Sequence, residues 1–178
     1  VQISNCLKLG SGTMLAFDST PKAGNNLQLR LQQLTLRGSG ALLAIQVPEK
    51  PAESGRISID AVDCVFDFAD SRTPLFLFQS HVRFSGWLKQ IKMTGKGSVA
   101  KPGLLIAQWM HPQSGKRTAI ETSHMEIAVP SIGIGTFQFA GPDSSTNPAD
   151  SALKEWHVPR DVPHPPGIDA SRLRFIRK

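Results

Sequence analysis

The sequence predicts an all-β fold, a right-handed parallel β-helix of about five stacked coils, on two observations. The first is an internal repeat: residues 9–17 read Leu-Gly-Ser-Gly-Thr-Met-Leu-Ala-Phe, and residues 37–45 read Arg-Gly-Ser-Gly-Ala-Leu-Leu-Ala-Ile. Weaker Gly-x-Gly motifs recur at 95–97 and 133–135. The second is the alternation of apolar and polar residues, the period of a strand with one buried face, with almost no helical periodicity.

A solenoid explains both observations better than a β-sandwich does. Every coil of a solenoid turns its corner at the same place, and glycine tolerates a positive φ there. A sandwich also contains alternating strands, but it has no reason to repeat the same turn residues at a fixed interval.

The repeat and the turn residues divide residues 1–145 into five coils of strand, tight turn and strand. Their bounds are 1–26, 27–55, 56–82, 83–117 and 118–145. Alternating runs supply the strands in order: Leu27 to Leu31, Leu34 to Leu36, Ile57 to Ala61, Phe66 to Phe68, Leu75 to Leu77, and Phe137 to Phe139. Loops rich in Pro, Gly, Ser and Asp follow at 18–21, 48–55, 112–115 and 141–148. We expect the lumen to be lined by Leu15, Leu43, Leu77 and Phe139.

Residues 146–178 form a C-terminal cap and strap in this prediction. A helix is expected from Pro148 to Trp156, because proline suits the first turn and Ala149, Ala152 and Leu153 continue it. Four prolines and one glycine within residues 157–168 exclude a regular helix or strand there. We expect this stretch to lie extended along the outside of the stack, with the helix closing its end.

The composition is that of a globular domain with a modest positive charge. The chain has 178 residues, 40% of them apolar and 19% charged, with a formal net charge of +6. Such a charge favours polyanions, but the cations are scattered, and no platform of interleaved aromatics predicts specific nucleic-acid binding. No run approaches the ~20 apolar residues of a membrane span. The chain begins at Val1 and enters a strand at once, so we expect a segment of a larger protein.

The two cysteines, Cys6 and Cys64, fall at equivalent places in the first and third coils. Two strand spacings of about 4.8 Å would hold them roughly 10 Å apart, too far for a disulfide. Buried free thiols are therefore expected.

Several short motifs resemble one known kind of protein region. They are Ile3-Ser4-Asn5-Cys6, Leu34-Thr35-Leu36-Arg37-Gly38, Asp63-Cys64-Val65-Phe66, Ala140-Gly141-Pro142 and Pro166-Gly167-Ile168-Asp169. Their succession resembles the repeat region beyond the kinase domain of large planctomycete serine/threonine protein kinases. The resemblance implies a right-handed parallel β-helix that serves as a non-catalytic module of a multidomain signalling protein. The parent would carry its kinase domain, and any membrane anchor, outside this segment, which would then be extracytoplasmic.

The segment itself carries no kinase motif. A phosphate-cradling loop needs a glycine at its sixth place, where the two Gly-Ser-Gly motifs have Leu15 and Leu43. Asp67-Phe68-Ala69 lacks the glycine of the metal-binding triplet, and no His-Arg-Asp is present. The glycines are interpreted as corner residues.

An alternative hypothesis is a carbohydrate-active enzyme, because pectate-lyase-like β-helices include polysaccharide lyases and glycoside hydrolases. The candidate acidic residues fall in the third coil: Asp60, Asp63, Asp67 and Asp70. Hydrolysis needs two carboxyls roughly 5–10 Å apart, and calcium needs several converging oxygens. Solvated side chains or turn caps are the favoured interpretation of these aspartates. The five histidines show no metal-ligand spacing, so no metal or cofactor is expected.

The residues of the fourth coil favour a binding role over a catalytic one. Trp87, Lys89, Lys92 and Trp109 all lie in the fourth coil, and aromatic faces beside cations hold sugar rings or anionic glycans. Packing of Trp109 in the core, with Trp156 plugging the end of the stack, is the favoured interpretation of these two rings. The sequence thus predicts a non-catalytic binding or scaffolding module whose partner is a polysaccharide or another protein.

Overall fold

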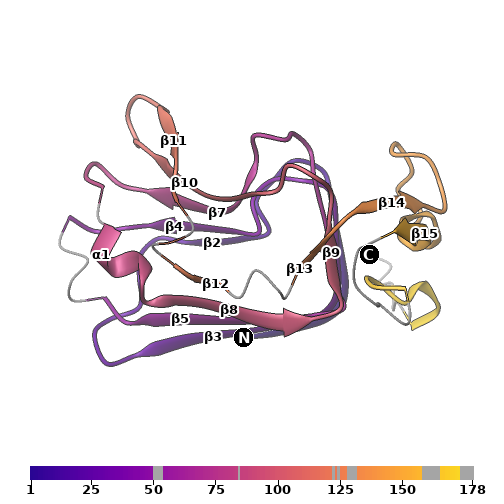
Figure 1. The fold of residues 1–178 in the computed structure, drawn as a ribbon, viewed down its shortest axis with the longest axis horizontal. Helices are drawn as coiled ribbons and strands as arrows, with labels where there is room; N and C mark the ends of the chain where they lie inside the picture. Colours follow the sequence, from indigo (N-terminus) through magenta and orange to yellow (C-terminus); the bar gives the residue numbers. More distant parts are fainter. Residues whose placement is uncertain are drawn as a thin grey trace, which may run out of the picture.

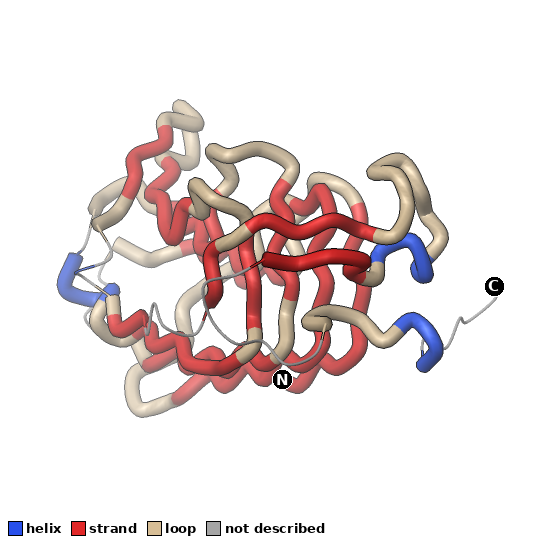
Figure 2. The backbone as a smooth tube through the Cα atoms, turned by 45° about the vertical axis from the view of Figure 1, so that its right-hand side comes forward, coloured by secondary structure: helices blue, strands red, loops and turns tan. Residues whose placement is uncertain are grey.

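The computed structural model describes residues 1–49, 54–83, 85–121, 123, 125–127, 132–157 and 165–172. Strands make up 52% of the described residues, and most of them form a parallel β-solenoid of about four turns (Figure 1). The fold class predicted from the sequence is confirmed. Figure 2 shows the stacked coils and how little of the chain is helical.

Each turn of the solenoid has three sides. The first side holds the N-terminal half of β3 (Asn26–Ser39), β5 (Arg56–Val62), β8 (Ile91–Lys96) and β12 (Glu126–Ile127). The second side holds the C-terminal half of β3, β6 (Val65–Phe68), β9 (Ser98–Ala100) and β13 (Ile132–Ile134). The third side holds β2 (Leu15–Phe17), β4 (Leu43–Gln46), β7 (Pro74–Gln79) and β10 (Leu105–Met110).

Neighbouring coils pair in parallel throughout these three sides. Strand β1 (Gln2–Leu9) pairs with β3 across both of its halves. The antiparallel strand β11 (Arg117–Ala119) closes the third side against β10. The one α-helix of the described residues, α1 (Ser85–Leu88), connects β7 to β8.

The corner between the first and second sides is a ladder of residues with positive φ. Asn5, Gln33 and Asp63 have φ of 46°, 54° and 52°, and Gly97 has 68°. The register of the flanking strands stacks these four positions on one another. Asn and Asp tolerate this conformation better than most residues, which is why single residues suffice for the corner. The sequence analysis did not predict this corner.

The Gly-Ser-Gly motifs form the next corner, between the second and third sides. Gly10 and Gly38 both have positive φ. Gly40 lies so close to the Ser11 carbonyl oxygen of the preceding coil that a Cβ atom would overlap it. The interpretation of these glycines as corner residues is therefore confirmed.

Two of the four residues expected in the lumen lie there. Leu43 is completely buried in the main core, and Leu15 of the first coil packs against the same core. Leu77 does not belong to that core, because Phe76 occupies the position that pairs with Leu43. The run 75–78 is apolar on both faces of its strand, so alternation alone did not reveal that Phe76 and Phe78 face inward.

The fourth expected lumen residue, Phe139, lies outside the solenoid. It belongs to β14 (Thr136–Phe139), which pairs antiparallel with β15 (Leu153–His157). The predicted helix from Pro148 to Trp156 is likewise wrong: a short 3-10 helix, η4 (Pro148–Ser151), is followed directly by strand β15. The β14–β15 hairpin lies beside the second side of the solenoid (Figure 1).

Apolar packing and a buried arginine together attach this hairpin to the solenoid. Phe137 and Leu153 pack on Val65 and Val99 of the second side. The guanidinium of Arg37 donates to the backbone carbonyls of Gly141 and Asp150, each at 2.7 Å. It also lies 4.4 Å from the centre of the Phe139 ring, and only 2% of its side chain is exposed. Phe139 lies outside the lumen because its strand pairs with β15, and there its ring contacts the Arg37 cation.

A C-terminal strap, residues 165–169, crosses three coils along the positive-φ corner. The Gly167 amide donates to the Asp63 carbonyl at 2.6 Å, and the Ile168 amide donates to Thr35 Oγ1 at 2.9 Å. The Asn5 side chain accepts from the Asp169 amide at 2.7 Å and donates to its carbonyl at 3.1 Å. The expected extended path outside the stack thus holds for these residues, while 158–164 lie outside the described residues.

The two cysteines are free, as expected, but only Cys64 is fully buried, and Cys6 is partly exposed. Leu34 of β3 pairs with Cys6 and separates it from the coil that carries Cys64. Burial raises the pKa of the Cys64 thiol to about 12 and also raises the pKa of Cys6.

We therefore expect Cys64 to resist thiol reagents at pH 8, because the thiolate is the reactive form and burial also blocks access. Dithionitrobenzoate should label native protein slowly and at Cys6 alone, and both thiols should react in urea. In a Cys6→Ser variant the native reaction should disappear. Rapid labelling of that variant would contradict the buried position of Cys64.

Candidate functional site

The outward side chains of the first side form a continuous polar surface, which we call the polar face. Alternation on β3, β5 and β8 buries Leu29, Ile59 and Met93 and turns the intervening residues to solvent. The polar face consists of Asn26, Gln28, Arg30, Arg56, Ser58, Asp60, Lys89, Gln90, Lys92, Thr94 and Glu126.

Strand register arranges these residues in rows across the coils. One row is Arg30, Asp60 and Thr94. The next row is Gln28, Ser58, Lys92 and Glu126. Members of a row lie one strand spacing apart, about 4.8 Å, so the backbone fixes a regular array of polar groups.

The polar face is hollowed by three adjoining depressions. One of about 410 Å³ is lined by Arg30, Asp60 and Lys92 among others. A second of about 350 Å³ shares Ser58 and Lys92 with the first. A third of about 420 Å³ shares Arg56 and Gln90 with the second. Each has the volume of a small-molecule site, and together they form an elongated groove.

Lys89 and Lys92 lie on the polar face, but the tryptophans predicted to accompany them do not. Trp87 and Trp109 are 4% and 7% exposed. Both rings pack on Phe78, with centroids 5.7 Å and 5.5 Å from its own. Their faces are covered, so they are not available to a sugar ring.

Trp87 contributes to the site through its position instead. Its carbonyl oxygen accepts the Gln90 amide at 2.8 Å, which closes the turn that carries Lys89 and Gln90. Burial of Trp87 and Leu88 therefore anchors the segment from which those two polar side chains extend.

The four candidate aspartates are separated by the corners of the solenoid. Asp60 alone lies on the polar face, and Asp63 occupies the positive-φ corner under the strap. Asp67 lies on the second side, almost buried, and forms an ion pair with Lys101 at 2.6 Å. In the described part of the chain, no three His, Cys, Asp or Glu residues gather in a way that could hold a metal.

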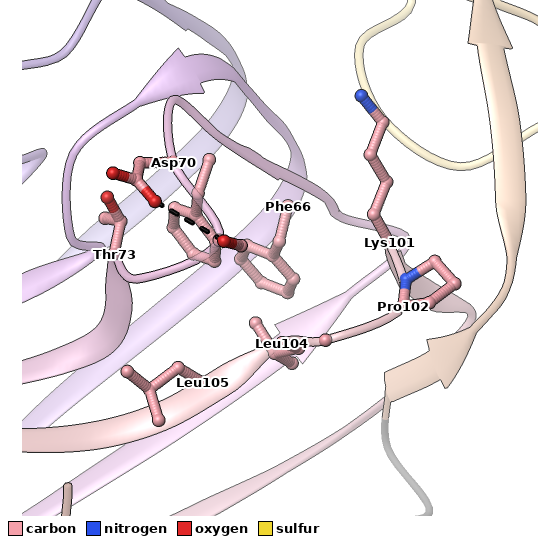
Figure 3. Close-up of a pocket in the computed structure, with 10 residues that line it drawn as sticks. Phe66, Asp70, Thr73, Lys101, Pro102, Leu104 and Leu105 are labelled. Atoms are coloured by element: carbon pink, nitrogen blue, oxygen red, sulfur yellow. Dashed lines mark hydrogen bonds between the residues drawn. The ribbon is translucent and has the colours of Figure 1, made fainter.

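Asp70 lies at the turn between β6 and β7, beside a small depression (Figure 3). Its carboxylate accepts the Arg72 amide at 2.8 Å, and this hydrogen bond is the main cause that lowers the pKa of Asp70. Phe66 and Leu104 line the depression, but its volume of about 40 Å³ holds little more than water. Asp70 is therefore a turn cap, the role that the sequence analysis favoured.

The sequence analysis missed Arg30, Arg56 and most of the amides and hydroxyls of the polar face. Their signal was present: every outward position of 26–32 and 56–60 is polar, and the repeat places these two runs on adjacent strands. The outward residues of stacked strands had to be considered together, rather than each motif alone.

Within the described residues, no helix has the length and apolar character needed to cross a bilayer. Comparisons of the chain with models of protein families, with curated proteins and with solved structures find no match.

Proposed function

We propose that this chain is a non-catalytic binding module that holds a carbohydrate polymer along the polar face. The observation that carries this proposal is the array of amide, hydroxyl and charged groups, registered by parallel strands and hollowed into one groove. Sugars present hydroxyls in a regular series, and groups held on a rigid sheet lose little entropy when they bind them.

The free hydrogen-bonding capacity of this surface supports the same proposal. Among the described residues, the side chains of Arg30, Asp60 and Lys92 have no hydrogen-bond or ion-pair partner in the protein. These groups line the depression of about 410 Å³ beside Gln28 and Thr94. Donors and acceptors thus lie ready for a polyhydroxylated ligand.

The distribution of carboxylates favours binding over catalysis. On the polar face the carboxylates are Asp60 on β5 and Glu126 on β12. They lie two strands and one row apart, about 12 Å between backbones, whereas glycosidases place their carboxyls roughly 5–10 Å apart. A glycoside hydrolase, one form of the rival proposal, would need a closer pair of carboxyls than this surface provides.

The resemblance to the repeat regions of kinases extends the proposal to the parent protein. We place the module in a larger serine/threonine kinase-like signalling protein, where it would bring the other domains to a glycan. Reading the gene on both sides of this segment tests that placement, and flanking sequence without a kinase domain would overturn it.

Polysaccharide binding is tested by affinity electrophoresis on a panel of soluble glycans. An Arg30→Ala/Asp60→Ala variant should lose at least about tenfold in affinity, because each exposed group contributes one or two hydrogen bonds. Its melting temperature should change little, since surface substitutions rarely exceed about 0.5 kcal/mol.

The matched control is Gln46→Ala/Gln79→Ala, which removes outward polar side chains from the third side. It should bind like the unaltered protein. Equal losses in both variants, or no retardation by any glycan, would reject the polar face as the site. Release of reducing ends or unsaturated products from a glycan would show that the module is an enzyme.

A further inference from the structure

We infer that the middle depression of the polar face, beside Lys89, is a subsite for an anionic group, so that the bound glycan is acidic. This inference rests on the proposed function and adds the chemical class of the ligand. We call this depression, of about 350 Å³, the anion subsite; its lining residues are Asn26, Arg56, Ser58, Lys89, Gln90, Lys92 and Glu126.

Three cations converge on the anion subsite from two coils. Arg56 extends from β5, Lys92 from β8, and Lys89 from the turn before β8. Glu126, on the outermost strand, supplies the opposing carboxylate. The lining thus carries a net charge of two positive units on one shallow surface.

Two internal hydrogen bonds leave this lining with donors to offer. The Arg56 Nε donates to Gln90 Oε1 at 3.2 Å, and the Ser58 hydroxyl donates to Asn26 Oδ1 at 3.2 Å. Each amide oxygen therefore already accepts one hydrogen bond within the lining. The donors that remain are the terminal nitrogens of Arg56, the two ammonium groups and the amide nitrogens of Asn26 and Gln90.

A donor-rich concave surface fits a ligand group that only accepts hydrogen bonds. A carboxylate or a sulfate meets that condition, and the fixed orientation of the Arg56 guanidinium suits two parallel hydrogen bonds to such a group. Within the described residues, Lys89 and Lys92 have no partner in the protein, so an anion would not have to displace one.

The neighbouring depression of about 410 Å³ favours a glycan over a nucleic acid as the carrier of this anion. Beside Arg30 and Lys92 its lining adds Gln28, Asp60 and Thr94, which suit hydroxyl groups. No aromatic side chain lines any of the three depressions, so bases would find no ring on which to stack.

The test compares three oligosaccharides of equal length by calorimetry: an oligogalacturonate for the carboxylate, a carrageenan fragment, which has no carboxylate, for the sulfate, and a cello-oligosaccharide as the neutral probe. One of the two acidic probes should bind at least about tenfold more tightly than the neutral probe, and the tighter of the two identifies the anion. Its affinity should fall as salt increases.

The diagnostic variant is Arg56→Gln/Lys92→Gln, and its control is Lys116→Gln/Lys154→Gln, which removes the same charge from exposed positions elsewhere. The first variant should bind the acidic probe about tenfold more weakly and the neutral probe unchanged, and the control should lose less than about twofold. Lys89→Gln, in the turn, provides an independent variant and should weaken acidic binding in the same direction.

The outcomes separate this inference from the proposed function. If the neutral probe binds as tightly as the acidic ones, the anion subsite is rejected and the binding module stands. If no oligosaccharide binds, the proposed function falls as well. Equal losses of affinity in the diagnostic and control variants would show that the protein's net charge, and not the anion subsite, attracts the acidic probe. Tighter binding of a single-stranded DNA oligomer would overturn the assignment to glycans.

Discussion

Replacing Leu43 by alanine is expected to lower the free energy of unfolding by about 2–5 kcal/mol. Leu43 is completely buried, and its neighbours in the row, Leu15 and Phe76, belong to coils on either side. The backbones of adjacent coils are hydrogen-bonded in fixed register, so they cannot close on the space that the missing side chain leaves. The loss of unfolding free energy should therefore be as large as for a leucine in a well-packed core.

The matched control is Leu15→Ala, the same substitution one coil away in the same row. Leu15 is only partly buried, because it lies in the first coil, and its loss should cost clearly less. Urea denaturation followed by tryptophan fluorescence measures both variants. Equal costs would contradict the assignment of Leu43 to the interior of the lumen.

An Arg37→Met variant is expected to lose about 2–4 kcal/mol, because two carbonyl oxygens would each lose a hydrogen bond from a charged donor. These carbonyls, of Gly141 and Asp150, belong to the loop of the β14–β15 hairpin. Methionine retains much of the apolar stem of arginine, so the change isolates the guanidinium. The hairpin should also become more sensitive to limited proteolysis, with cuts first within 136–157.

Asp143→Ala provides the control for that prediction. Its carboxylate lies 3.3 Å from the Arg37 guanidinium but is 94% exposed. An exposed partner contributes little, so the variant should lose less than about 1 kcal/mol. A large loss from Asp143→Ala, with a small one from Arg37→Met, would show that the ion pair and not the backbone carbonyls holds the hairpin.

The sequence sufficed for the solenoid because its two main signals are local. A repeated glycine turn and a period of two residues are imposed by corners and strands, whatever their neighbours are. The error at Leu77 arose where both faces of a strand are apolar, since alternation then gives no preference. The helix expected at 148–156 was overridden by a tertiary contact, the pairing of Trp156 with Phe137 in the hairpin.

The positive-φ corner was hidden for a related reason. Asn5, Gln33, Asp63 and Gly97 share a backbone conformation but not a residue type. No repeated residue type marks the corner, and only the strand register of the assembled coils reveals it.

The candidate site was predicted in part. Lys89 and Lys92 lie on the polar face, since charged side chains on a strand and its flanking turn must reach solvent, and their contact with a ligand stays a prediction. Trp87 and Trp109 were placed beside them by proximity in sequence, but large aromatic surfaces gain most from burial. The remaining groups come from other coils, and their convergence depends on strand register.

The strap at 165–169 also bears on how the molecule assembles. Pairing between adjacent coils joins residues about thirty positions apart, a modest loop for a parallel sheet. The strap instead joins positions separated by 133 and 164 residues, and it can bind only after the corner of three coils exists. Because such long-range closure forms late, the coils should stack one after another before the strap docks. In hydrogen exchange, the Ile168 and Asp169 amides would then open well before those of the central coil, which makes the strap the place where unfolding begins.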